Sequence, residues 1–268
     1  MQEQRAYLDV KGRKLYFALY LPAQKKADCA LLMAEPFGEE KRSCSRMLHR
    51  LAKKLQQENI AVLKFDFSGT GDSAGTAAIA EWRHWQEELD KALEFLQQQS
   101  QAKQLALLGL RAGALLAAEL ASRKNVDKLL LGEPILSGSE LLVELEKRQK
   151  IKEAISGSPV SDPAEDSWRK GENVDFAGFE INPDFAAQLN QAELLAYLQK
   201  LNPATAVLLL RVSAVNKFPS AWLPCIEALE RHPGSQALIV KDKPFWGQLE
   251  YYESDAVLQP MLEFLHGS

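Results

Sequence analysis

Residues 105–122 read LALLGLRAGALLAAELAS, an apolar run that passes through two glycines directly into a helix-forming segment. The first part, 105–110, is continuously apolar apart from one glycine, which is typical of a parallel strand covered on both faces. The second part, 112–122, is rich in Ala and Leu, the strongest helix formers. The stretch therefore predicts a buried strand, a tight turn at Gly109-Leu110-Arg111-Ala112-Gly113 and a helix in immediate succession.

The segments on either side repeat this alternation of strand and helix. Apolar residues at helical spacing fill 47–55 and 82–96. Further strands are expected at 13–21, 29–34, 60–67, 129–132, 206–212 and 236–240. Strands that alternate with helices at this rhythm imply right-handed crossovers and a mostly parallel sheet. The fold class predicted is therefore α/β, with helices on both faces of a central sheet.

The pattern changes between the strand at 129–132 and the strand at 206–212. Charged helices and irregular segments such as SGSPVSDPAEDSW occupy this part of the chain. We therefore divide the chain into a first core part, 1–138, an inserted helical cap, 139–201, and a second core part, 202–268. A cap at this place would cover the carboxyl ends of the strands, where open α/β sheets bind their ligands.

The turn at 109–113 has the spacing of the nucleophile elbow of α/β-hydrolases, G-x-S-x-G, with arginine in place of the serine. Both glycines are present, so we expect an α/β-hydrolase fold with the elbow geometry kept. Arginine cannot attack an acyl carbon, because its guanidinium stays protonated and has no free lone pair.

The other two members of a Ser-His-Asp triad are also missing from their expected positions. The segment 212–222, VSAVNKFPSAW, offers no carboxylate after its strand, and 241–250, KDKPFWGQLE, contains no histidine. The four histidines, His49, His84, His232 and His266, lie elsewhere in the sequence and are interpreted as surface or packing residues.

Composition excludes several classes of function. The 268 residues carry 32 basic and 36 acidic side chains and a net charge of −4, which gives no reason to expect nucleic acid as a partner. No apolar run could span a membrane, and MQEQRAYLDV lacks the features of a signal peptide, so we expect a cytoplasmic protein. Cys29, Cys44 and Cys225 lack metal-ligand spacing and are expected to pack in the core. Neither a metal nor a cofactor is expected.

Several stretches resemble one bacterial family, the exosortase A system-associated hydrolase 2 family. They are EPFGEEKRSCSRM, DFSGTGDSAG with AEWRHW, GLRAGA, VDFAGFEINPDFAAQL, LGEPILSG and KPFWGQLE, between about residues 30 and 258. The resemblance implies an α/β-hydrolase fold in which the arginine elbow is usual, and a link to exopolysaccharide production and the sorting of proteins to the cell surface. It implies no substrate, since fold alone does not establish chemistry.

Arg111 is the central candidate of the site, and three carboxylates could pair with it: Glu39, Glu40 and Glu133. One interpretation is a structural salt bridge that fills the place of the serine, since a guanidinium under a cap needs a partner. A second is a clamp for a ligand carboxylate or phosphate. A third is catalysis, with Glu39 or Glu40 activating water and Arg111 stabilising an oxyanion.

Glu133 is also a candidate for ligand binding, together with four other residues. Phe37 and Gly38 lie in the loop that supplies an oxyanion-hole amide in relatives. Phe245 and Trp246 stand where the catalytic histidine would be expected, and either close the pocket by packing or stack on a ligand. The run ELEKRQKIK at 144–152 is interpreted as a solvated face of a cap helix.

The sequence therefore predicts a hydrolase-fold protein without a Ser-His-Asp triad that binds an acidic or acyl small molecule, or a protein partner. The alternative is an ester or thioester hydrolase with a carboxylate-activated water. Whether the chain is an enzyme, and whether it forms a homo-oligomer, stays open.

Overall fold

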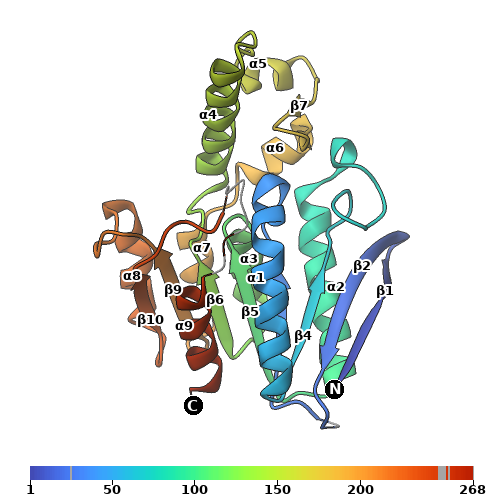
Figure 1. Ribbon diagram of the computed structural model, residues 1–268, viewed down its shortest axis with the longest axis vertical. Helices are drawn as coiled ribbons and strands as arrows, with labels where there is room; N and C mark the ends of the chain where they lie inside the picture. The colour runs from blue at the N-terminus through green and yellow to red at the C-terminus, as the bar shows by residue number, and fades with distance from the viewer. Residues whose placement is uncertain (25, 247–251, 253, 268) are drawn as a thin grey trace.

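An eight-stranded sheet runs through the protein in the computed structural model, which describes residues 1–24, 26–246, 252 and 254–267 (Figure 1). The order across the sheet is β1-β2-β4-β3-β5-β6-β9-β10. β1 and β2 pair antiparallel, β2 pairs antiparallel with β4, and every other neighbouring pair is parallel. The strands are β1 (Gln2–Val10), β2 (Arg13–Leu21), β3 (Cys29–Ala34), β4 (Ile60–Phe65), β5 (Gln104–Leu110), β6 (Lys128–Gly132), β9 (Ala206–Val212) and β10 (Gln236–Val240).

Helices cover both faces of this sheet, as predicted. They are α1 (Gly38–Gln57), α2 (Trp82–Ser100), α3 (Gly113–Arg123), α8 (Leu223–Leu229) and α9 (Asp255–His266), with short 3₁₀ turns η1 (Ala77–Ile79) and η2 (Ser220–Trp222). The residues of β3 alternate between two cores. Leu32 packs in the core that contains α2 and α3, whereas Leu31 and Met33 pack in the core that contains α1 and α9. Burial on both faces explains why β3 is apolar throughout.

The predicted strands are present, and the largest differences concern β4 and β1. β4 ends at Phe65 rather than at residue 67, and the chain turns at residues 68 and 69. β1 was not predicted at all. It lies at the edge of the sheet and most of its side chains are exposed, so it lacks the apolar alternation that marks a strand in sequence. The three cysteines are buried and unpaired, which confirms the prediction that they pack in the core.

The segment between β6 and β9 forms its own group of elements, most of which stand beyond one end of the sheet in Figure 1. They are α4 (Gly138–Ser156), α5 (Ala164–Arg169), β7 (Val174–Asp175), β8 (Glu180–Ile181), α6 (Pro183–Leu189) and α7 (Leu194–Leu198). β7 and β8 form a small separate hairpin, whereas α7 packs against α3 and α8. The domain boundaries at 139 and 201 stay predictions.

No helix in the described part of the chain is long and apolar enough to cross a membrane.

Candidate functional site

The elbow between β5 and α3 has the strained geometry that the sequence predicts. Arg111 adopts a left-handed φ of 53°, which is costly for a residue with a Cβ. A Cβ on Gly113 would lie 2.1 Å from the carbonyl oxygen of Ala34, and one on Gly109 would lie 2.5 Å from Cα of Ala114. Only glycine fits at either position, so β3, β5 and α3 approach one another closely and hold residue 111 above the end of the sheet.

The guanidinium of Arg111 is buried, and two carboxylates accept hydrogen bonds from it. Nε donates to Glu40 Oε1 and Oε2 at 3.1 and 3.3 Å, and Nη2 donates to Glu144 Oε1 and Oε2 at 2.8 and 2.9 Å. Nη1 lies 3.5 Å from the carbonyl oxygen of Glu133. Burial disfavours the charged form, but the two carboxylates outweigh it and raise the pKa of Arg111. The side chain is therefore a permanent cation at this position.

A second arginine completes the arrangement. Arg148, one turn after Glu144 on α4, donates to Glu40 Oε1 at 2.8 Å and also contacts Glu144. Arg111, Arg148, Glu40 and Glu144, called the ion-pair cluster below, thus bring two positive and two negative charges together. They come from the elbow, from α1 and from α4, so the cluster joins the segment between β6 and β9 to the core.

Of the three carboxylates predicted as partners of Arg111, only one forms an ion pair with it. Glu40 is a partner. Glu39 is not, because it forms an ion pair with Lys152 on α4. The carboxylate of Glu133 accepts a hydrogen bond from the amide of Val212 at 2.6 Å, so only its backbone carbonyl faces Arg111.

The interpretation of residues 144–152 as a solvated helix face holds for one side of the helix only. Glu144, Arg148 and Lys152 are spaced four residues apart, so they lie on one face of α4, and that face contacts Glu39, Glu40 and Arg111. Only the other side of the run, with the pair Glu146 and Lys150, fits the prediction. The four-residue spacing was visible in the sequence, but it does not tell an intrahelical pair from contacts to another element.

The two aromatic residues after β10 have different positions. Phe245 is buried in the core with α9, so packing is its role in the structure. Trp246 is half-buried and covers Arg111, whose Cζ lies 4.8 Å from the ring centroid. A guanidinium over an aromatic face is stabilised by the ring quadrupole. The rest of the expected histidine loop, 247–250, lies outside the described residues.

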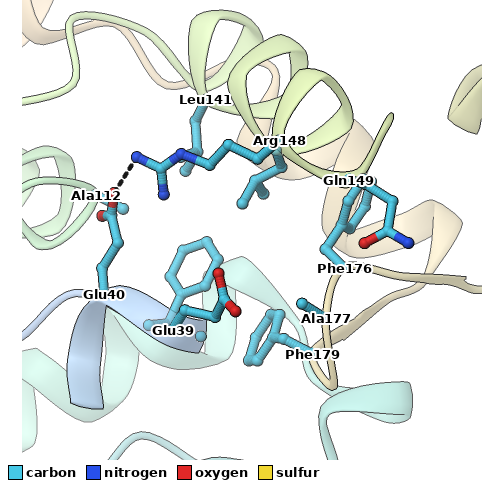
Figure 2. Close-up of a pocket in the computed structure, with 12 residues that line it drawn as sticks. Glu39, Glu40, Ala112, Leu141, Arg148, Gln149, Phe176, Ala177 and Phe179 are labelled. Atoms are coloured by element: carbon cyan, nitrogen blue, oxygen red, sulfur yellow. Dashed lines mark hydrogen bonds and ion pairs between the residues drawn. The ribbon is translucent and has the colours of Figure 1, made fainter. Parts of the chain in front are cut away.

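A small cavity lies beside the ion-pair cluster, between α1, α4 and the β7–β8 hairpin (Figure 2). Its volume is about 30 Å³, room for one or two water molecules. Figure 2 shows Glu40 and Arg148 joined at one side, with Phe176 and Phe179 on another. The remaining lining residues are Phe37, Gly38, Glu39, Ala112, Leu141, Leu145, Gln149 and Ala177. The walls are mainly apolar, and polar groups gather at the cluster.

Phe37 and Gly38 line this cavity as the sequence suggested for a ligand site. The ring of Phe37 stacks on Phe179 with centroids 4.8 Å apart, and Gly38 lies against the same residue. Within the described part of the chain, the backbone amides of Phe37 and Ala112 donate to no acceptor. These two amides occupy the positions that form the oxyanion hole in α/β-hydrolases.

The motif SGTGDS at 68–73 serves the scaffold. Asp66 accepts a hydrogen bond from the amide of Asp72 at 2.8 Å, and a Cβ on Gly71 would lie 2.1 Å from the Asp66 carboxylate. Asp66 also pairs with Lys41. The described residues contain no cluster of side chains suited to holding a metal ion.

Comparisons with known proteins identify the family and the fold. The family profile for serine aminopeptidase, S33, matches residues 41–216. Est1E from Butyrivibrio proteoclasticus with bound ferulic acid superposes with a TM-score of 0.69 at 15% identity, over 97% of this chain and 99% of that one. The α/β hydrolase GrgF from Penicillium sp. sh18 gives 0.68 at 19% identity, over 99% and 98%. A thermostable carboxyl esterase from Bacillus coagulans gives 0.63 at 15% identity, over 100% and 99%.

No curated protein matches the sequence. The structural likenesses, all at low identity, show the fold, and the family profile covers more than half of the chain. The chain therefore belongs to the serine aminopeptidase S33 family and has the α/β-hydrolase fold.

Proposed function

We propose that the protein binds a small molecule with an acidic or acyl group, and that Arg111 is the anchor for that group. The observation that carries the proposal is the guanidinium at the elbow, held above the sheet where relatives place their nucleophile and surrounded by carboxylates. Buried arginines bind carboxylates through paired, charge-assisted hydrogen bonds. An elbow occupied in this way suits recognition of an anion better than attack on an acyl carbon.

The positions of the histidines support binding over triad hydrolysis. His49 on α1 is hydrogen-bonded to the buried Tyr20 of β2, and His84 lies beside Glu81 at the start of α2. His266 pairs with Glu58, and His232 is buried after α8. A general base must lie within hydrogen-bond reach of the reacting group, and none of these side chains pairs with a residue of the ion-pair cluster.

The wider role is part of the same proposal. The quoted stretches, from EPFGEEKRSCSRM to KPFWGQLE, support membership of the exosortase A system-associated branch, which has an arginine elbow. A task in exopolysaccharide or surface-protein production follows from that resemblance. A place in the cytoplasm, expected from the sequence, is part of the same proposal. Esterases among the structural neighbours support a small molecule as ligand. A protein partner or a homo-oligomer is compatible with it.

Isothermal titration with a panel of anions tests the proposal. The panel contains short and medium-chain carboxylates, aromatic carboxylates including ferulate, and phosphate monoesters. We expect at least one member to bind the wild type and to lose its binding in Arg111→Ala, with Arg169→Ala as the control at an exposed ion pair. Binding that survives in Arg111→Ala, or an absence of binding throughout the panel, would contradict the role of Arg111 as anchor.

A hydrolytic role is the second candidate, because a specific observation favours it. The amides of Phe37 and Ala112, which donate to no acceptor among the described residues, lie beside the cavity and would bind the oxyanion of an acyl substrate. In that case Glu40 would activate water and Arg111 would stabilise charge. The engagement of Glu40 by both Arg111 and Arg148 weighs against it, since a general base needs a free lone pair directed at water.

A further inference from the structure

The two carboxylates on Arg111 differ in how easily a ligand can reach them. The side chain of Glu40 is 7% exposed, whereas that of Glu144 is 31% exposed. Glu40 belongs to the first turn of α1, which packs on the sheet, whereas Glu144 belongs to α4, outside the sheet and its covering helices. Both oxygens of Glu144 lie within 2.9 Å of a single nitrogen, Arg111 Nη2. Glu144 therefore binds Arg111 as the carboxylate of a ligand would. It is the more exposed of the two carboxylates on Arg111.

The charge of the cluster selects one class of ligand. Arg111 and Arg148 balance Glu40 and Glu144, so the cluster is neutral as it stands. If the Glu144 side chain leaves, two cations face one buried carboxylate and the site carries one net positive charge. A monoanion restores neutrality. A phosphate dianion would add a second negative charge beside the fixed Glu40, at a cost that low local polarity increases.

The cavity beside the cluster specifies the rest of the ligand. Its walls include Phe37, Phe176, Phe179, Leu141 and Leu145 (Figure 2). A volume of about 30 Å³ admits no aromatic ring or acyl chain, so such a group enters only if Leu141 and Leu145 of α4 move away from the opposite wall while Arg148 keeps its contact with Glu40. Glu144 and two of the apolar wall residues lie on α4. Release of Glu144 from Arg111 would therefore open the apolar wall as well.

We propose that Glu144 is an internal stand-in for the ligand, and that the ligand is a monocarboxylate with an apolar or aromatic body. Its carboxylate replaces that of Glu144 on Arg111, and its body occupies the space between Phe37, Phe179 and α4. This inference rests on the proposed function, since it names the ligand class and the competing group of the same site.

Three matched probes and two variants test this inference by isothermal titration. The probes are 3-phenylpropionate, the uncharged 3-phenylpropionamide and phenyl phosphate. Glu144→Gln removes the competing charge, and Glu146→Gln is the control, because Glu146 lies on the same helix but pairs with Lys150. We expect the affinity for 3-phenylpropionate to be at least about tenfold higher in Glu144→Gln than in the wild type, because the carboxylate of Glu144 no longer competes for Arg111. Glu146→Gln should match the wild type.

The wild type alone supplies a second measurement that does not depend on the folding of a variant. We expect 3-phenylpropionate to bind it more tightly than either the amide or phenyl phosphate. Equal or weaker binding of 3-phenylpropionate to a folded Glu144→Gln, or a preference for phenyl phosphate, would overturn the inference while leaving Arg111 as an anion anchor. If neither these probes nor any member of the wider anion panel binds, both the inference and the proposed function are contradicted.

Discussion

Arg111 stabilises the fold by balancing the charges of Glu40 and Glu144. Its removal would leave Glu40 buried with only Arg148 to balance it. Breaking a buried ion pair from one side costs about 3–5 kcal/mol. We therefore expect Arg111→Ala to lower the free energy of unfolding by about this amount in urea denaturation. Arg169→Ala, at an exposed pair on α5, should leave it unchanged within error. Equal effects of the two substitutions would show that the ion-pair cluster does not support the fold.

The carboxyl group of Glu133 makes the free energy of unfolding depend on pH, in a direction that follows from its pKa shift. Burial raises the pKa of its carboxyl above the usual 4.5, and the Val212 amide and the charge of Arg111 offset this only in part. The folded state thus holds the proton more tightly than the unfolded state. Stability from this group is fully present below the unfolded pKa and is lost as pH rises through the folded pKa.

The pH dependence is measured by comparing the wild type with Glu133→Gln, which keeps an acceptor for the Val212 amide. Between about pH 4 and pH 7, we expect the wild type to lose stability relative to the variant as pH increases. A constant difference in free energy of unfolding, or one that changes in the opposite direction, would contradict the raised pKa.

Sequence reasoning found half of the ion-pair cluster. Arg111 stood out because it replaces an expected serine, and Glu40 because its loop faces the elbow. Glu144 and Arg148 were missed, since charged residues four apart on a helix most often pair with each other in solvent. Their contact with α1 and the elbow depends on where α4 lies relative to the sheet, which no local pattern encodes.

At the level of elements, the elbow depends on the close approach of α3 to β3. A Cβ on Gly113 would overlap the carbonyl oxygen of Ala34. We expect Gly113→Ala to destabilise the protein by about 1–3 kcal/mol or more, because β3 or α3 must shift. Gly267→Ala is the matched control, since its nearest neighbour would lie at 3.5 Å, an ordinary contact. Thermal unfolding of the two variants measures the difference, and a neutral Gly113→Ala would refute this account of the elbow.

α4 is joined to the first turn of α1 by charges, and the pair Lys152–Glu39 is the more exposed part of this connection. Lys152→Glu places two like charges together, so we expect the backbone amides of α4 to exchange with deuterium about two- to fivefold faster, as suits an exposed pair. The double variant Lys152→Glu/Glu39→Lys should restore the wild-type rate. Unchanged exchange in the single variant would mean that this pair does not hold α4.

The elements themselves were largely predictable where burial dictates composition. β3 and β5 are covered on both faces, so their apolar runs mark them without ambiguity. β1 was missed because it is held by backbone pairing with β2 along its whole length while its side chains remain exposed. α4 shows no clear apolar face, because polar contacts as well as apolar ones join it to the rest of the protein.

For the whole molecule, the α/β-hydrolase fold follows from one short stretch and its surroundings. Two glycines that admit no Cβ, one strained residue between them and a strand-to-helix transition require a particular packing of β3, β5 and α3. That packing is independent of which side chain residue 111 carries. The scaffold therefore accommodates arginine at residue 111.

The most direct test of this account is hydrolysis of short and medium acyl p-nitrophenyl esters and acyl thioesters by the wild type, Arg111→Ser, Arg111→Ala and Glu40→Ala. We predict no turnover above background by the wild type, and none by a folded Arg111→Ser, because the new serine would have no histidine to activate it. Turnover by the wild type that Arg111→Ala and Glu40→Ala both abolish would contradict the account and assign activation of water to the ion-pair cluster.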